Sequence, residues 1–235
     1  MAEFRYDLHI HTKETSKCGH VPAATMVKTY KELGYQGIAI TDHLHEEYIN
    51  TLQCKENWND CVDAYLTGYR LAKKAAENLD FDVILGMEIR FPQNNNDFLI
   101  YGFDESFLFD HPYAFRTNIC EFYKAFKDQV LILQAHPYRG GGVDLQPQCL
   151  HGLEVINCNP RHDSNNHLAY KLADSRDPGF IRISASDAHR TEDIGRASVF
   201  FNHRLKDSFD LAASLQSGKY RMDCPVFSDL LKQHA

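Results

Sequence analysis

The stretch Asp-Leu-His-Ile-His-Thr at residues 7–12 decides how the rest of the sequence is interpreted. It closes an apolar segment, residues 4–10, that has the length and composition of a β-strand. Side chains at positions i and i+2 of a strand point to the same side, about 6–7 Å apart, so His9 and His11 can bind one cation together. The first strand therefore predicts a metal site.

Apolar segments of strand length alternate with longer amphipathic segments over the rest of the chain, which is typical of β-α units. Further strands are expected at 37–41, 83–91, 98–102, 130–135, 153–157, 180–185 and 197–201. Helices are expected at 25–33, 58–78, 115–127, 166–174 and 209–215. No repeat or linker divides the 235 residues, so we expect one domain over 1–235, a distorted α/β barrel.

Further candidate metal ligands fall at the ends of these strands or within them. They are His43, Glu88, Asp97, His136, Asp187 and His189. Because the carboxyl ends of the strands of a β/α barrel converge on one face, we expect these side chains to meet there. Asp187 and His189 repeat the i, i+2 spacing, and Glu88 has two oxygens that can bridge two cations about 3.5–4 Å apart.

The charge balance bears on the class of partner. Lys and Arg total 25 against 32 Asp and Glu, a net charge of −7, whereas broad nucleic-acid binding needs a basic surface. A small phosphorylated substrate held by metal ions is compatible with this balance. The thirteen histidines agree with a metal-binding role.

The cysteines and the N-terminus bear on the compartment. The seven cysteines are scattered without a C-x-x-C pair, which disfavours a structural zinc knot or a disulfide framework. The N-terminus lacks a signal-peptide pattern, and no apolar run approaches the roughly 18 residues that span a bilayer. We therefore expect no membrane partner and a cytoplasmic location.

In this order, the motifs resemble the PHP superfamily, named for polymerase and histidinol phosphatase. The resemblance runs through DLHIHT at 7–12, SKCGH at 16–20, ITDH at 40–43, GME at 86–88, AHP at 135–137 and SDAH at 186–189. It implies a distorted (β/α)7 TIM-like barrel with the metal site at the C-terminal ends of the strands. It also implies two to three divalent transition-metal ions (Zn, Mn or Fe) and the hydrolysis of phosphate esters. The SKCGH stretch is most similar to the histidinol phosphatase branch.

The resemblance implies three metal positions. The first is held by His9, His11, Glu88 and Asp187. Glu88 bridges to the second, which His136 completes with one more ligand. The third is held by His20, His43 and His189, and only the resemblance nominates His20.

One position departs from the pattern of the family. Many relatives have a histidine between the positions of Glu88 and His136, where this chain offers Asp97. A carboxylate there favours manganese or iron over zinc, because it is a harder donor than imidazole. His111 is the competing candidate for this second metal position.

Other residues are candidates for substrate contact and proton transfer. Arg139, in the stretch HPYRGGG, suits a bidentate contact to phosphate, and Arg161, Arg190 and His45 are further candidates for substrate binding. The expected nucleophile is a hydroxide activated by the metal ions, with Asp187 or His189 moving the proton.

Three other functions remain open at this stage. A nuclease acting on nucleic-acid ends is disfavoured by the net charge of −7. A non-catalytic metal-binding PHP module typically loses ligand positions, whereas this chain retains nearly all of them. An amidohydrolase characteristically carries a lysine on a barrel strand, and none stands in the expected strand here. The substrate, the metal and the oligomeric state are not determined by the sequence.

Overall fold

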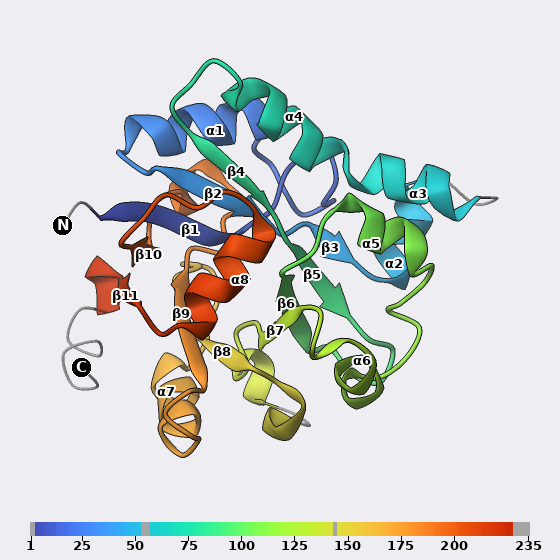
Figure 1. The fold of residues 1–235 in the computed structure, drawn as a ribbon, viewed down its shortest axis with the longest axis vertical. Helices are drawn as coiled ribbons and strands as arrows, with labels where there is room; N and C mark the ends of the chain where they lie inside the picture. Colours follow the sequence, from blue (N-terminus) through green and yellow to red (C-terminus); the bar gives the residue numbers. More distant parts are fainter. Residues whose placement is uncertain (1–2, 53–56, 143–144, 228–235) are drawn as a thin grey trace.

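The computed structural model of the chain describes residues 3–52, 57–142 and 145–227 and arranges their strands in two sheets (Figure 1). The first sheet has the order β11 (Tyr220–Asp223), β10 (Ser198–Phe201), β1 (Phe4–Ile10), β2 (Gly37–Ile40) and β4 (Asp82–Leu85). The second has the order β3 (His43–Leu44), β5 (Met87–Arg90), β6 (Asp97–Tyr101), β7 (Leu131–Gln134), β8 (Gly152–Asn157) and β9 (Ile181–Ala185).

Both sheets are mixed. Parallel pairs join β1 to β2, β2 to β4, β3 to β5, β7 to β8 and β8 to β9. Antiparallel pairs join β1 to β10, β10 to β11, β5 to β6 and β6 to β7. The short connection 91–96 joins β5 and β6 as an antiparallel hairpin, whereas a parallel pair would need a much longer crossover connection.

The two sheets meet along two lines. At one, the backbone N–H groups of Gly86 and Glu88 donate to the carbonyls of Ile40 and Asp42 at 2.9 and 3.1 Å. At the other, the loop after β9 pairs with the end of β1 through Ala188, whose carbonyl accepts from the N–H of His11 at 3.0 Å. The predicted α/β fold is confirmed. The strand ends that carry the candidate ligands lie where the two sheets meet.

Helices pack around the sheets. They are α1 (Ala23–Glu32), α2 (Glu46–Thr51), α3 (Trp58–Tyr65), α4 (Thr67–Ala76), α5 (Glu105–Asp110), α6 (Ile119–Phe126), α7 (Asn166–Asp174) and α8 (Ser208–Gln216). Short 3-10 turns occupy Arg139–Gly141, Pro147–Cys149, Thr191–Asp193 and Pro225–Phe227. In Figure 1, α1 and α4 lie side by side over β2 and β4.

An apolar cluster joins the two sheets from inside. Leu8 of β1, Leu99 of β6, Leu133 of β7 and Ile183 of β9 are each fully buried in it. Because these residues come from both sheets, the space between the sheets is a packed core, as inside small α/β barrels.

Two expected elements are each broken in two, for tertiary reasons. The helix expected at 58–78 divides into α3 and α4 because the Thr15 hydroxyl donates to the carbonyl of Tyr65 and accepts from the N–H of Gly68. The strand expected at 83–91 divides into β4 and β5 at Gly86. A Cβ at this position would lie 2.8 Å from the Thr41 side chain, so only glycine fits.

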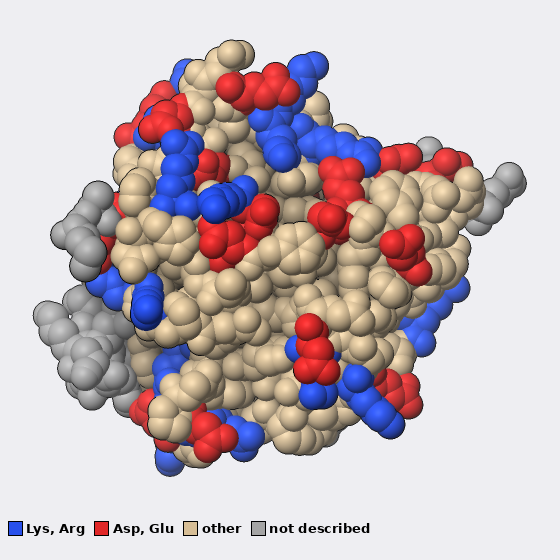
Figure 2. Space-filling view, in the orientation of Figure 1, with Lys and Arg blue, Asp and Glu red and all other residues tan. Residues whose placement is uncertain are grey.

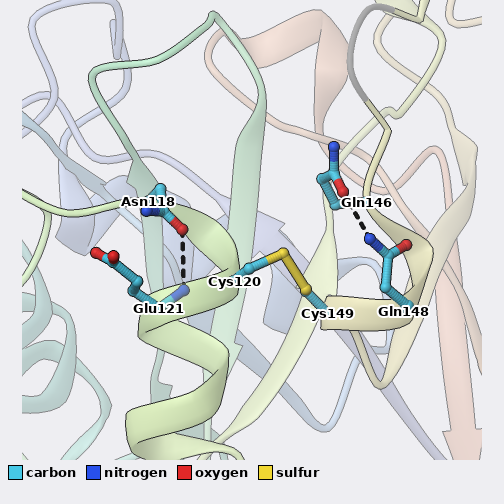
Figure 3. Close-up of a disulfide and its surroundings, with 6 residues drawn as sticks. All are labelled: Asn118, Cys120, Glu121, Gln146, Gln148 and Cys149. Atoms are coloured by element: carbon cyan, nitrogen blue, oxygen red, sulfur yellow. Dashed lines mark hydrogen bonds between the residues drawn. A yellow bond between two sulfur atoms is a disulfide. The ribbon is translucent and has the colours of Figure 1, made fainter.

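One expectation about the cysteines is wrong. Cys120 at the start of α6 and Cys149 in the 147–149 turn form a disulfide, 29 residues apart in sequence (Figure 3). The fold brings them together, so their spacing alone could not reveal the pair. Disulfides persist mainly in oxidising compartments, and the cytoplasmic location therefore stays a prediction.

No helix in the described ranges is long and apolar enough to cross a membrane.

Candidate metal centre

The first group of predicted ligands converges at the ends of β1, β5 and β9. His9 and His11 are fully buried, and their Nε2 atoms lie 3.0 Å apart. Each Nε2 is 3.3 Å from an oxygen of Glu88 and 3.4–3.5 Å from Oδ1 of Asp187. The four side chains predicted for the first metal are therefore in contact.

Glu88 connects this group to the second. Its Oε1 is 3.1 Å from Nε2 of His136, which is 4.0 Å from Oδ2 of Asp97. Atoms of His9, Glu88 and His136 lie close enough together to hold one cation, and so do those of His43, Glu88 and Asp97. Both oxygens of Asp97 also accept hydrogen bonds from Arg90 at 2.7 Å.

The third group lies on the other side of Glu88. Nδ1 of His43 is 2.9 Å from Oε2 of Glu88, and His11, His43 and His189 form a further set able to hold a cation. His20 is exposed at the rim of the same cavity, with its N–H donating to the His189 carbonyl at 2.7 Å. It belongs to none of the candidate ligand sets among the described residues, so its role as a ligand stays a prediction.

Two buried atoms at the centre of the cluster have no hydrogen-bond partner within the described part of the chain. They are Nδ1 of His43 and Oε2 of Glu88, which lie 2.9 Å apart but do not have the geometry of a hydrogen bond. Buried polar atoms are normally satisfied, and atoms left over at a convergence of lone-pair donors indicate a missing cation. The side chains present thus fit divalent metal ions.

The electrostatics of the cluster agree with a cation site. Burial raises the pKa of Glu88, but the charges of His9 and His43 outweigh it and hold this pKa well below its usual range. The pKa of Asp187 is also well below its usual range, because His9 and Arg139 outweigh the effect of burial. Both carboxylates are therefore ionised at neutral pH and available as anionic ligands.

Glu154 of β8 orients the ligands from behind, and the sequence analysis did not identify it. It is fully buried and accepts from Nδ1 of His9 at 3.0 Å and from the backbone N–H of His136 at 2.8 Å. An Nδ1–H bonded in this way leaves Nε2 of His9 as the free donor atom facing the cluster. In the sequence, Glu154 only looks like a polar residue within a strand.

Asp42 has a similar role for the turn after β1. It accepts from the N–H and hydroxyl of Thr12 at 2.7 Å and from the Ser16 hydroxyl at 2.6 Å. The oxygen of Ser16 in turn lies 3.4 Å from Nδ1 of His11 and accepts from the N–H of His43. The serine of the SKCGH stretch therefore orients two of the histidines.

Cys18 of the same stretch is a further residue at this site that the sequence analysis did not single out. Burial raises the pKa of its thiol, but hydrogen bonds with His189 and His43 outweigh this and lower the pKa to about 4. The thiol therefore lies beside His43 and His189 of the third group of ligands.

Two predicted ligands stand in unusual backbone conformations. His136 has φ 27° and Asp187 has φ 51°, in the left-handed region that non-glycine residues rarely occupy. Such conformations cost of the order of 1–3 kcal/mol and cluster at functional sites, where the surrounding structure enforces them.

The predicted ligands other than His9 and His11 line a cavity of about 580 Å³, and so do four arginines: Arg90, Arg139, Arg161 and Arg190. Arg139 donates to Asp187 at 2.6 Å and to Asn157 at 2.8 Å. Arg161 makes a bidentate pair with Asp193 at 2.5 and 2.7 Å. A protein with a net charge of −7 therefore gathers four arginines at its candidate metal site, three of them paired with carboxylates.

The remaining sequence candidates lie apart from the cavity. His45 is buried between His43 and Tyr48 and is absent from the cavity wall as described. His111, the competitor of Asp97, packs against Phe107 and Phe126 with ring centroids 4.5 and 4.8 Å away. It belongs to no candidate ligand set among the described residues.

Comparisons with known proteins agree with this arrangement. The sequence model of the PHP domain matches residues 7–192. No curated protein sequence matches the chain.

Three solved structures share the fold at low sequence identity. A two-domain protein from Bacteroides vulgatus that contains a predicted PHP-like metal-dependent phosphoesterase superposes with a TM-score of 0.69 and 16% identity, over 95% of this chain and 65% of that one. A candidate metal-dependent phosphoesterase from Bifidobacterium adolescentis gives 0.54 and 16%, over 89% and 95%. An amidohydrolase from Chromobacterium violaceum, with bound SO4 and no metal, gives 0.50 and 14%, over 94% and 99%. The chain thus spans about two thirds of the Bacteroides protein.

Proposed function

The chain belongs to the PHP domain family, and we propose that it is a metal-dependent phosphoesterase acting on the phosphate ester of a small metabolite or nucleotide. The observation that carries the proposal is the contact of His9 and His11 with both Glu88 and Asp187, two carboxylates that line a cavity with four arginines. Imidazole and carboxylate donors beside a cavity lined with guanidinium groups suit an anionic ester.

We assign two to three divalent ions (Zn, Mn or Fe) to this centre. His9, His11, Glu88 and Asp187 would hold the first; Glu88, Asp97 and His136 the second; and His20, His43 and His189 the third. Ions bound there would polarise the phosphoryl oxygens and lower the pKa of a bound water towards neutrality.

Arg139 is the proposed phosphate clamp. Its guanidinium is fixed by Asp187 and Asn157, so little side-chain freedom is lost when it binds a ligand. Its Nε is buried and has no hydrogen-bond partner among the described residues. A phosphoryl oxygen at this nitrogen would satisfy it.

Asp187 and His189 are the proposed proton carriers. Nδ1 of His189 lies 2.9 Å from the carbonyl of Asp187, an arrangement that places the proton on Nδ1 and leaves Nε2 to accept one. Asp187 is ionised because its pKa is held low by His9 and Arg139. A nucleophilic water would pass its proton to whichever of the two groups has a lone pair not engaged by an ion, and that group would return it to the leaving alcohol.

The surface charge favours a small partner over nucleic acid. On the face drawn in Figure 2, basic and acidic side chains lie next to one another instead of forming one basic surface over the described residues. Many of the charged side chains of the described residues are paired, as in Arg204 with Asp82 and Arg70 with Glu105. A nuclease would need a basic groove that follows the backbone of a strand.

A metal-reconstitution screen tests the proposal. The protein is stripped with a chelator, reloaded separately with Mn²⁺, Fe²⁺ or Zn²⁺, and assayed against phosphomonoesters, including histidinol phosphate, and against phosphodiesters. We expect monoester hydrolysis that chelation abolishes and metal restores. Faster cleavage of oligonucleotide ends would replace this proposal with the nuclease. Full metal binding without hydrolysis of any ester would indicate a non-catalytic metal-binding module.

A further inference from the structure

Arg90 lines the cavity but has no role in the proposed metal chemistry. It stands two residues after Glu88 on β5, so both side chains leave the same face of the strand. Across the antiparallel pair, Arg90 lies directly opposite Asp97. Its side chain is 29% exposed and contributes to the wall of the cavity.

Asp97 holds this guanidinium in a fixed orientation. Nε and Nη2 of Arg90 donate to the two oxygens of Asp97, each at 2.7 Å. A guanidinium has five N–H groups, so three remain beyond these two. A carboxylate has about four lone-pair sites, so Asp97 can hold Arg90 and still bind a metal.

Arg90 stands apart from the other arginines of the cavity. Arg139 follows β7, Arg161 follows β8 and Arg190 follows β9, whereas Arg90 ends β5. From β5 to β7 the sheet crosses one intervening strand, which separates the roots of Arg90 and Arg139 by about 10 Å along the sheet. Asp97 holds one guanidinium, whereas Asp187 and Asn157 hold the other, so each arginine has its own place on the cavity wall.

The wall around Arg90 is polar. Asn95 and Asn96, from the turn between β5 and β6, line the cavity beside it, and Tyr48 lines it from α2. Amide, phenol and guanidinium groups together form a surface that donates hydrogen bonds. Such a surface suits anionic oxygens better than an apolar leaving group.

We propose that Arg90, oriented by Asp97, binds a second anionic group of the substrate, a carboxylate or a second phosphate. This inference rests on the proposed function and names its substrate class: phosphate esters that carry another anion. The ester phosphate lies at the metal cluster and Arg139, and the second anion lies at Arg90. No other step of the proposed chemistry passes through Arg90.

Pairs of substrates that differ in one anionic group test this proposal. Glycerol 3-phosphate and 3-phosphoglycerate differ by a carboxylate, and 1,3-propanediol monophosphate and bisphosphate differ by a phosphate. We expect the metal-loaded protein to prefer the doubly anionic member of at least one pair. Whichever pair shows the preference identifies the second anion as carboxylate or phosphate.

Variants of Arg90 assign the preference to this residue. In Arg90→Met, the ratio of kcat/KM between the two members should fall about 10- to 100-fold, mainly through KM of the doubly anionic one. Arg90→Lys should restore part of the ratio, because it keeps the charge but not the fork. Binding of 3-phosphonopropionate relative to propylphosphonate, measured by calorimetry, should change in parallel without turnover.

Arg116→Met is the matched control. Arg116 makes the same bidentate pair, with Glu46 at 2.8 Å, but lies outside the cavity, so its loss should leave the ratio unchanged. Equal use of both members by the unaltered protein overturns this proposal, and so does an Arg90→Met ratio equal to that of Arg116→Met. Failure to hydrolyse any ester of the reconstitution screen would instead overturn the proposed function.

Discussion

The two sides of the candidate metal centre differ in how firmly the fold holds them. On the inner side, His9, His11 and Asp187 are at most 1% exposed, and Glu154 supports His9 from behind. On the outer side, Asp97 shares its oxygens with Arg90, and His20 lies exposed at the rim. The inner side is thus preorganised for a cation, while the outer side is also shaped for contact with a substrate.

This difference separates what the family has in common from what distinguishes this chain. The inner ligands stand where the motifs placed them, and the departure at Asp97 falls on the outer side, next to an arginine. We expect substitutions on the inner side to abolish chemistry and those on the outer side to change metal content or selectivity.

Glu88→Gln should have the largest effect. Glu88 contacts His9, His11, His43 and His136, and the amide keeps its shape but removes the charge that offsets two cations. We expect turnover to fall on the order of 10³-fold or more, with loss of at least one metal equivalent. Steady-state kinetics and elemental analysis measure both. Near-normal turnover with full metal content would show that Glu88 is no bridging ligand.

Glu154→Gln should have the next largest effect, although Glu154 is not a proposed ligand. It fixes the proton on Nδ1 of His9, and loss of such a partner typically costs about 10- to 100-fold in metal affinity or activity. Competitive metal titration measures the affinity. Glu105→Gln is the control, because Glu105 pairs with Arg70 at the surface. Equal affinities in the two variants would remove Glu154 from the account.

The strand residues show how much of the fold and site the sequence could predict. The strand expected at 4–10 and the helix expected at 166–174 have the bounds of β1 and α7, because their apolar patterns are complete within the segment. The candidate ligands were predicted from their i, i+2 spacing, from their places at the ends of strands or within them, and from the resemblance to the PHP superfamily. Eight of the nine predicted ligands belong to candidate metal sets, and His20 does not.

The parts that could not be predicted depend on contacts between distant segments. The two-residue strand β3 is too short to carry a pattern. The strand expected at 83–91 is interrupted at Gly86, where the side chain of Thr41, the residue after β2, leaves no room for a Cβ. Glu154 and the Cys120–Cys149 disulfide become meaningful only when β8 meets β1 and α6 meets the 147–149 turn. The histidinol phosphatase branch also stays a prediction, since the matched family is broader than that branch.

Asp97 and His111 give the sharpest test of the outer side. Asp97→Ala should remove one metal equivalent selectively and lower turnover about 10- to 100-fold, because its carboxylate lies near Glu88 and His136. Asp97→His should restore the equivalent and shift the preference towards zinc. His111→Ala should keep the full metal content, since His111 packs among aromatic rings. The opposite pattern would move the second metal to His111.

His20→Ala should have the smallest effect of these substitutions. His20 is exposed, so its loss should weaken the third metal about tenfold or less while the other two remain bound. Cys18→Ala is the comparison, because the Cys18 thiol contacts His43 and His189 beside that position. Metal titration of both variants shows whether His20 or Cys18 binds the third metal. Loss of the third metal only in Cys18→Ala would transfer the ligand role from His20 to Cys18.

The most direct test of the central claim is the metal content of the reconstituted protein. Among the described residues, four sets of candidate ligands are linked by shared members, His9, His11, His43 and Glu88, which is enough for a multinuclear centre but excessive for a single ion. Elemental analysis after chelation, reloading and removal of loosely bound metal should give two to three equivalents of transition metal per chain. One equivalent or less would contradict a multinuclear phosphoesterase centre.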